Sequence, residues 1–266
     1  MNRIARLIRR DAGAPPAQPL VAGRPARVPP GLCVYAIGDV HGRLDCLRAL
    51  HDLVREDAAG LPRGTEKLLV YLGDYVDRGP DSRAVLDVLI AEPLPGFRSV
   101  HLMGNHDAWL LAFLEDTTIG PAWLRYGGDA TLQSYGIATT APTENLDALI
   151  ALQGQLRARL PLEHIAFIEA MPLSWQIGDY LFVHAGVRPG LPLTDQQPED
   201  LLWIREPFLS TPQDLGKVVV HGHTVTTEPE VRTNRIGVDT GACWSGRLTC
   251  AVLDRTSYRF LTTSAA

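Results

Sequence analysis

The chain has 266 residues, 45% of them hydrophobic, and a formal net charge of −5 at pH 7. This size and composition allow one large core, so we expect a single catalytic domain over residues 31–266. The acidic balance argues against a nucleic-acid-binding surface. We therefore expect no nucleic-acid partner. No apolar stretch reaches the length of a membrane span, so we also expect no membrane-spanning segment.

Residues 1–30 differ from the rest, because arginines alternate with Ile4, Leu7 and Ile8 before a stretch rich in proline, alanine and glycine. We expect a disordered basic, proline-rich tail. The helical spacing of the three apolar residues leaves a weak contact with a membrane surface or a partner as the alternative. The four cysteines show no Cys-x-x-Cys spacing, which favours reduced thiols and a cytoplasmic location.

Apolar runs and helical stripes alternate in the front half of the chain. Cys33–Ile37, Leu68–Leu72 and Val100–Met103 predict short buried strands. The apolar spacing predicts one helix over residues 44–54 and another over residues 85–90. Strands and helices in this order predict a mainly parallel sheet flanked by helices.

A polar cassette follows each of these strands. The three cassettes are Gly38-Asp39-Val40-His41-Gly42, Gly73-Asp74-Tyr75-Val76-Asp77-Arg78-Gly79 and Gly104-Asn105-His106-Asp107. Ligands gather beyond the carboxyl ends of strands in open α/β sheets, so we expect the cassettes to meet at one site. Carboxylate, imidazole and amide donors suit manganese, iron or zinc better than calcium.

Two further apolar runs end in histidine. Leu181–Val183 precedes His184, and Val218–Val220 precedes His221-Gly222-His223. Six donors are too many for one ion that keeps an open position, but they fit two ions that share a carboxylate. Asp74, in the middle cassette, is the natural bridge. Two ions about 3.5 to 4 Å apart can ionise a shared water and stabilise displacement at phosphorus.

The sequence contains no nucleophilic serine or cysteine in an elbow motif, no phosphate-cradling loop with lysine and no Rossmann fingerprint. The expected nucleophile is therefore a hydroxide held by both metal ions rather than a side chain.

Together these motifs resemble calcineurin-like metallophosphoesterases of the phosphoprotein phosphatase family, in particular its bacterial and phage-type serine/threonine phosphatases. The resemblance runs from about Val34 to Asp254 and includes Gly237-Val238-Asp239-Thr240-Gly241. It implies an α/β fold of two stacked mixed β-sheets flanked by helices. It also implies a first metal on Asp39, His41 and Asp74, and a second metal on Asp74, Asn105, His184 and His223.

The resemblance implies catalytic roles for three more residues: His106 as the general acid, Asp77 as the residue that orients it, and Arg78 as a phosphate ligand. These roles are chemically reasonable. The alkoxide of phosphoserine is a poor leaving group, so a proton donor lowers the barrier. A carboxylate behind the imidazole keeps it protonated and correctly turned. A guanidinium fork can hold two phosphoryl oxygens at once.

Two assignments are less direct. Arg205 resembles the family's second phosphate-binding arginine, with a surface salt bridge to Glu206 or Asp200 as the alternative. The family pattern uses the histidine after the glycine, which selects His223 and leaves His221 as a packing or supporting residue.

In the C-terminal half of the chain, the apolar runs are shorter. Short strands are expected at Val218–His221, Arg235–Val238, Leu248–Leu253 and Tyr258–Thr262. The motifs do not explain residues 117–171, where Asn145–Leu160 and His164–Ala170 look helical and Gly127-Gly128-Asp129 interrupts the pattern. This segment is either a helical cap at the pocket mouth or a peripheral layer. Asp107 is expected to cap or begin a helix over Ala108–Leu114. Trp203 and Trp244, near the motif loops, are expected to pack, with a place in the lining of the pocket as the alternative.

The leading hypothesis is a metal-dependent phosphomonoesterase that hydrolyses phosphoserine or phosphothreonine in proteins, with a phosphoprotein or phosphopeptide as its partner. The alternative is a hydrolase of diadenosine tetraphosphate on the same fold, whose anhydride chemistry needs less acid assistance; Asp77 favours the phosphatase. An inactive binding module is disfavoured because all the motif residues are present. The expected cofactor is two divalent ions, manganese first, with iron, zinc or magnesium as alternatives. The sequence does not indicate the oligomeric state.

Overall fold

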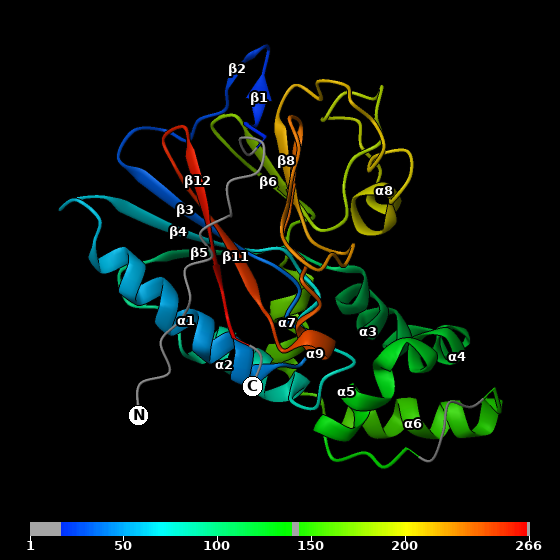
Figure 1. Ribbon diagram of the computed structural model, residues 1–266. Coiled ribbons are helices and arrows are strands. Elements are labelled where there is room, and N and C mark those ends of the chain that lie inside the picture. Colours follow the sequence, from blue (N-terminus) through cyan, green and yellow to red (C-terminus); the bar gives the residue numbers. More distant parts are fainter. Residues whose placement is uncertain (1–16, 140–143, 265–266) are drawn as a thin grey trace.

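The computed structural model describes residues 17–139 and 144–264, which include two stacked five-stranded sheets (Figure 1). The first sheet consists of β3 (Leu32–Ile37), β4 (Glu66–Tyr71), β5 (Arg98–His101), β11 (Thr249–Asp254) and β12 (Ser257–Thr262), in the order β12-β11-β3-β4-β5. The second consists of β6 (Ser174–Ile177), β7 (Tyr180–Val183), β8 (Val218–His221), β9 (Glu230–Val231) and β10 (Arg235–Gly237), in the order β6-β7-β8-β10-β9.

Both sheets are mixed. In the first, β3, β4 and β5 run parallel, whereas β11 and β12 are antiparallel additions. In the second, β7, β8 and β10 run parallel between antiparallel edge strands. The predicted fold of two stacked mixed sheets flanked by helices is therefore confirmed.

The side chains of β3 alternate between two cores, because successive residues of a strand point to opposite faces. Val34 and Ala36 join the core between the sheets, which also contains Phe182. Tyr35 and Ile37 join the core between the first sheet and the helices. A strand that is buried on both faces must be apolar throughout, which explains the continuous hydrophobic run in the sequence.

Helices cover the outer faces of the sandwich (Figure 1). Helices α1 (Leu44–Ala59) and α2 (Ser82–Ala91) lie against the first sheet, and α8 (Pro198–Trp203) lies against the second. The remaining helical elements are α3 (Asn105–Glu115), η1 (Thr117–Ile119), α4 (Gly120–Trp123), η2 (Leu124–Gly128), α5 (Asp129–Ser134), α6 (Leu146–Arg159), α7 (Leu162–Glu169) and α9 (Ala242–Ser245). Within the described part of the chain, no helix is both long and apolar enough to cross a membrane.

The predicted N-terminal tail is wrong for residues 17–30. Strands β1 (Leu20–Val21) and β2 (Arg24–Pro25) form a hairpin, and Ala26 and Val28 are buried. The backbone carbonyl of Ala26 also accepts a hydrogen bond from the Tyr180 hydroxyl. A few apolar side chains thus suffice to fix a stretch whose composition is otherwise typical of disorder. Residues 1–16, the rest of the predicted tail, lie outside the described residues.

The predicted capping role of Asp107 is confirmed. Helix α3 begins at Asn105, three residues earlier than predicted, and Asp107 caps it from within its first turn. Its carboxylate accepts hydrogen bonds from the backbone N–H groups of Gly104, Asp74 and Tyr75. Asp107 therefore ties the second cassette to the third, a contact across more than thirty residues that helix-capping rules do not predict.

Candidate metal centre and active site

The loops that follow five strands of the two sheets converge on one site. The cassettes come after β3, β4 and β5, and the two later histidines come after β7 and β8. All six predicted metal-ligand side chains are buried there: Asp39, His41, Asp74, Asn105, His184 and His223.

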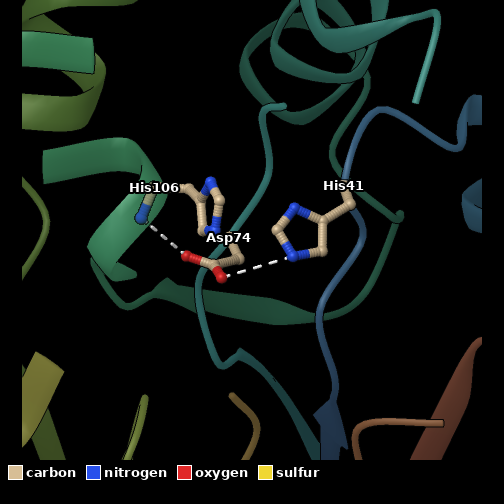
Figure 2. A group of neighbouring side chains, drawn as sticks. All are labelled: His41, Asp74 and His106. Carbon is tan, nitrogen blue, oxygen red and sulfur yellow. Dashed lines mark hydrogen bonds and ion pairs between the residues drawn. The ribbon is translucent and has the colours of Figure 1, made fainter. Parts of the chain in front are cut away.

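Asp74 lies between His41 and His106 (Figure 2). One carboxylate oxygen is 3.4 Å from Nε2 of His41, and the other is 3.5 Å from Nε2 of His184. Two clusters of mutually close donor atoms share Asp74: it groups with His41 and His106 in one, and with His184 and His223 in the other. A carboxylate between two clusters has the position that a bridge between two cations requires.

Backbone carbonyls fix the orientation of two of the histidines. Nδ1 of His41 donates to the carbonyl of Val76 at 2.8 Å, and Nδ1 of His184 donates to that of Leu72 at 2.9 Å. Each ring therefore turns Nε2 toward Asp74, as in histidines that bind metals, and Nε2 of His184 also lies 2.8 Å from the amide oxygen of Asn105.

The protonation of the buried histidines also suits a cation. Nε2 of His223 is buried and has no hydrogen-bond partner among the described residues. Burial lowers the pKa of His41 to about 3 and that of His223 to about 2, so both rings are neutral at pH 7. Neutral imidazole is the form that binds metal ions, so these residues fit a divalent cation.

Asp39 lies at the edge of this group rather than in either histidine cluster. Its carboxylate accepts a hydrogen bond from the backbone N–H of His223 at 3.0 Å. A Cβ on Gly222 would lie 2.0 Å from Asp39, so only glycine fits there. Burial raises the pKa of Asp39, and the nearby carboxylates of Asp239 and Asp74 raise it further. Three buried acids together indicate that positive charge belongs at this site.

Left-handed backbone conformations concentrate at the site. Among the non-glycine residues with positive φ are His41 (44°), Asp74 (53°), Asp77 (72°), Arg78 (68°) and His223 (61°). Such conformations cost of order 1–3 kcal/mol each and persist where surrounding contacts impose them. The loops are thus shaped to aim these side chains.

Beside the metal-ligand group, His106 and Asp77 form a buried pair, with His106 Nδ1 2.7 Å from Asp77 Oδ2. Burial alone would lower the pKa of His106, but the carboxylates of Asp74 and Asp77 outweigh it and raise the pKa above its usual value. The Arg78 guanidinium spans the site, donating to Nε2 of His41 at 2.7 Å and to Nε2 of His106 at 2.9 Å. An arginine held at this point can meet an anion beside the predicted acid.

Arg205 and His221 lie at the periphery. Arg205 is exposed, and its Nη2 is 3.5 Å from the backbone carbonyl of His223. Among the described residues it has no salt bridge to Glu206 or Asp200, and Asp200 pairs with Arg188 instead. His221 packs edge-on against Phe208 and belongs to neither donor cluster.

Four aromatic side chains lie around the site, two of which, Trp109 and Tyr126, were not expected there. Trp109 packs against His106, Tyr126 and Trp203, and Trp203 packs against His223. The exposed ring of Trp244 lies 4.8 Å from the Arg78 guanidinium carbon. We call Trp109, Tyr126, Trp203 and Trp244 the aromatic rim. Single aromatic residues in a sequence do not distinguish such a rim from ordinary core packing, so for Trp203 and Trp244 packing was preferred over the alternative of lining the pocket.

Comparison with known proteins identifies the class. Residues 33–246 match the family model described as calcineurin-like phosphoesterase. The chain therefore belongs to the calcineurin-like phosphoesterase family, whose members use a dinuclear metal site.

Similar proteins carry three kinds of name. The chain is 28% identical to serine/threonine-protein phosphatase 2 of Escherichia coli over 81% of its own length and 90% of the relative. It is 25% identical to the asymmetrical bis(5'-nucleosyl)-tetraphosphatase PrpE of Oceanobacillus iheyensis over 84% of its length and 87% of the relative. A cold-active protein-tyrosine phosphatase of a Shewanella species shares the fold, with a TM-score of 0.52, 19% identity and coverage of 88% of this chain and 83% of that one.

The site residues and the family match lead to the same conclusion. The chain is a metal-dependent phosphoesterase, and its buried histidine and aspartate clusters can bind metal ions.

Proposed function

We propose that this protein hydrolyses phosphoserine and phosphothreonine in proteins, with two divalent cations, manganese first, as its cofactor. The observation that supports this most is the buried His106–Asp77 pair beside Arg78. Hydrolysis of an alkyl phosphate expels a poor leaving group, and general acid catalysis of that step is worth about 10²- to 10⁴-fold in rate. An anhydride, which has a better leaving group, needs such a pair less.

In this proposal Asp39, His41 and Asp74 hold one cation, while Asp74, Asn105, His184 and His223 hold the other. Bound cations would supply Lewis acidity toward the phosphoryl group and lower the pKa of a water between them.

The other side chains act on the substrate directly. Arg78, assisted by Arg205, binds and orients the phosphoryl oxygens through its guanidinium fork. His106, when protonated on both ring nitrogens, gives its Nε2 proton to the oxygen of the departing serine or threonine and is left as neutral imidazole. Asp77 keeps the imidazole turned toward that oxygen through the hydrogen bond to Nδ1. Because Arg78 already touches His106, the phosphate and the proton donor are brought within reach of each other.

A second candidate, hydrolysis of dinucleoside polyphosphates, is favoured by the aromatic rim and by the names of several relatives. Flat rings at the mouth of the site, two of them well exposed at 54% for Tyr126 and 65% for Trp244, are suited to stacking on a nucleobase.

Competition between the two substrates tests the proposal. Manganese-loaded protein is offered a phosphoserine peptide and diadenosine tetraphosphate at equal concentration, and kcat/KM is measured for each. We expect the peptide to be preferred by at least about tenfold, in keeping with the acid contribution. The reverse preference would replace the proposed function with the second candidate. The cytoplasmic location predicted from the cysteines remains a prediction.

A further inference from the structure

The Asp77 carboxylate is completely buried and receives hydrogen bonds from a segment that the motifs do not explain. Oδ2 accepts from Trp123 Nε1 at 2.9 Å as well as from His106, and Oδ1 accepts from Thr131 Oγ1 at 2.6 Å. Trp123 ends α4 and Thr131 lies in α5, which are 46 and 54 residues beyond Asp77. Both oxygens are thus occupied by donors that define their direction.

The same segment also holds the backbone of the loop. The N–H of Asp77 is shared between Thr131 Oγ1 at 2.9 Å and Ser82 Oγ at 3.0 Å. The N–H of Arg78 donates to the carbonyl of Gly127 at 3.0 Å. Asp77 and Arg78 have φ values of 72° and 68°, a conformation that non-glycine residues rarely adopt without imposed contacts. These hydrogen bonds supply such contacts.

The segment is itself firmly attached to the sandwich. The Tyr135 hydroxyl is 2.7 Å from His164 Nδ1, and His164 Nε2 is 3.0 Å from a carboxylate oxygen of Asp87 in α2. Tyr135 follows α5 directly, so the chain behind Thr131 is fixed to α2 and α7. The donors to Asp77 therefore stand on rigid elements, as positioning of a catalytic group requires.

We propose that Trp123 and Thr131 are positioning residues, which fix the Asp77 carboxylate and through it turn His106 to protonate the leaving group. The inference rests on the proposed acid role of His106. Trp123 occupies the other lone pair of Oδ2 and Thr131 holds Oδ1, so Oδ2 keeps one direction for the hydrogen bond to His106. Part of the segment 117–171 then serves to orient the acid His106 through Asp77, besides any role as a cap or outer layer.

Small substitutions test this. Thr131→Val keeps the shape and removes the hydroxyl, Thr131→Ser restores it, and Trp123→Phe removes the indole N–H. Ser134→Ala in the same helix is the matched control, because the Ser134 hydroxyl contacts the Thr131 carbonyl and the Arg83 N–H but not Asp77.

Turnover is compared on phosphoserine peptide, which needs a proton donor, and on 4-nitrophenyl phosphate, whose leaving group does not. We expect Thr131→Val and Trp123→Phe to lose about 10- to 100-fold in kcat on the peptide and less than about threefold on the aryl ester. Thr131→Ser should recover most of the loss, and Ser134→Ala should change neither rate. Equal losses on both substrates would overturn the inference, since a general packing defect has no preference for the leaving group.

A second measurement does not depend on turnover. In the zinc-supplemented full-length protein, the proton on His106 Nδ1 is followed by NMR and assigned with His106→Asn. Thr131→Val and Trp123→Phe should shift this resonance, and Ser134→Ala should not. An unchanged resonance overturns the positioning role. Failure of the wild-type protein to hydrolyse any alkyl phosphate would overturn the proposed function instead, and the NMR result would still decide whether Trp123 and Thr131 control the pair.

Discussion

Asp74 has contacts with several parts of the site through both its side chain and its backbone. Its two carboxylate oxygens face His41 and His184, and one of them also accepts the backbone N–H of His106 (Figure 2). Its own N–H donates to Asp107, and its backbone is left-handed. Because this carboxylate contacts histidines of both donor clusters, loss of its negative charge should affect both clusters.

Asp74→Asn should therefore abolish the binding of both cations, because the amide keeps the volume but loses the negative charge between the two clusters. The measurement is metal content per chain by inductively coupled plasma mass spectrometry after manganese loading and desalting. Asp52→Asn, an exposed carboxylate in α1, is the control and should keep the wild-type stoichiometry. Two ions at full occupancy in Asp74→Asn would contradict the bridging role.

The role of His106 can be separated from metal binding. Its ring lies close enough to His41 and Asp74 to join a donor cluster, although the family pattern makes it the acid. If it is the acid, His106→Asn should keep the wild-type metal content and lose about 10²- to 10⁴-fold in kcat on an alkyl phosphate. If it is a ligand, metal content should fall instead. Metal analysis and steady-state kinetics on the same preparation distinguish the two results.

The sequence reveals such residues to different extents. Asp39, Asp74 and Asn105 were predicted because each comes one glycine after an apolar run at the end of a strand. Trp123 and Thr131 were not predicted, because their contact with Asp77 crosses 46 and 54 residues and no local pattern marks it. Local spacing identifies the donors of a site, whereas their supports depend on the tertiary fold.

At the scale of elements, hydrophobic periodicity in the sequence predicted the long helices. The predicted stripe over residues 44–54 corresponds to α1, and the helix predicted at Asn145–Leu160 corresponds to α6. The stretch from η1 to α5 consists of pieces of three to six residues. Such pieces are too short to display a 3.6-residue period, so the local structure around Trp123 and Thr131 was not predictable.

Helix α1 provides a test of the helix–sheet core. Leu50 is fully buried against the first sheet, so Leu50→Ala leaves a cavity and should lower the free energy of unfolding by about 2–5 kcal/mol. Leu162 in α7 is 82% exposed, so Leu162→Ala should change it by less than about 0.5 kcal/mol. Urea denaturation followed by circular dichroism measures both. Similar losses in the two variants would mean that α1 does not carry the core contacts described here.

At the scale of the whole molecule, seven of the eight histidines are buried. Burial lowers the pKa of His51, His101 and His221 to about 4 each. The fold thus holds these rings neutral, whereas the unfolded chain protonates them with the ordinary histidine pKa near 6.5. Since the unfolded state binds more protons below that pH, folding stability must fall as the pH falls from about 6.5 toward 4.

His51 lies away from the metal site, hydrogen-bonded to the Tyr71 hydroxyl, with Arg48, Arg55 and Asp52 nearby, so it can be tested separately. A pKa of about 4 against about 6.5 when unfolded implies a loss of about 2 kcal/mol between pH 7 and pH 5 from this ring. His51→Gln keeps a polar group for Tyr71 but does not titrate in this range. Urea denaturation at both pH values should therefore show a smaller acid loss in the variant, by about 2 kcal/mol. Equal losses in the wild type and the variant would mean that His51 is protonated in the folded protein, which its burial beside two arginines opposes.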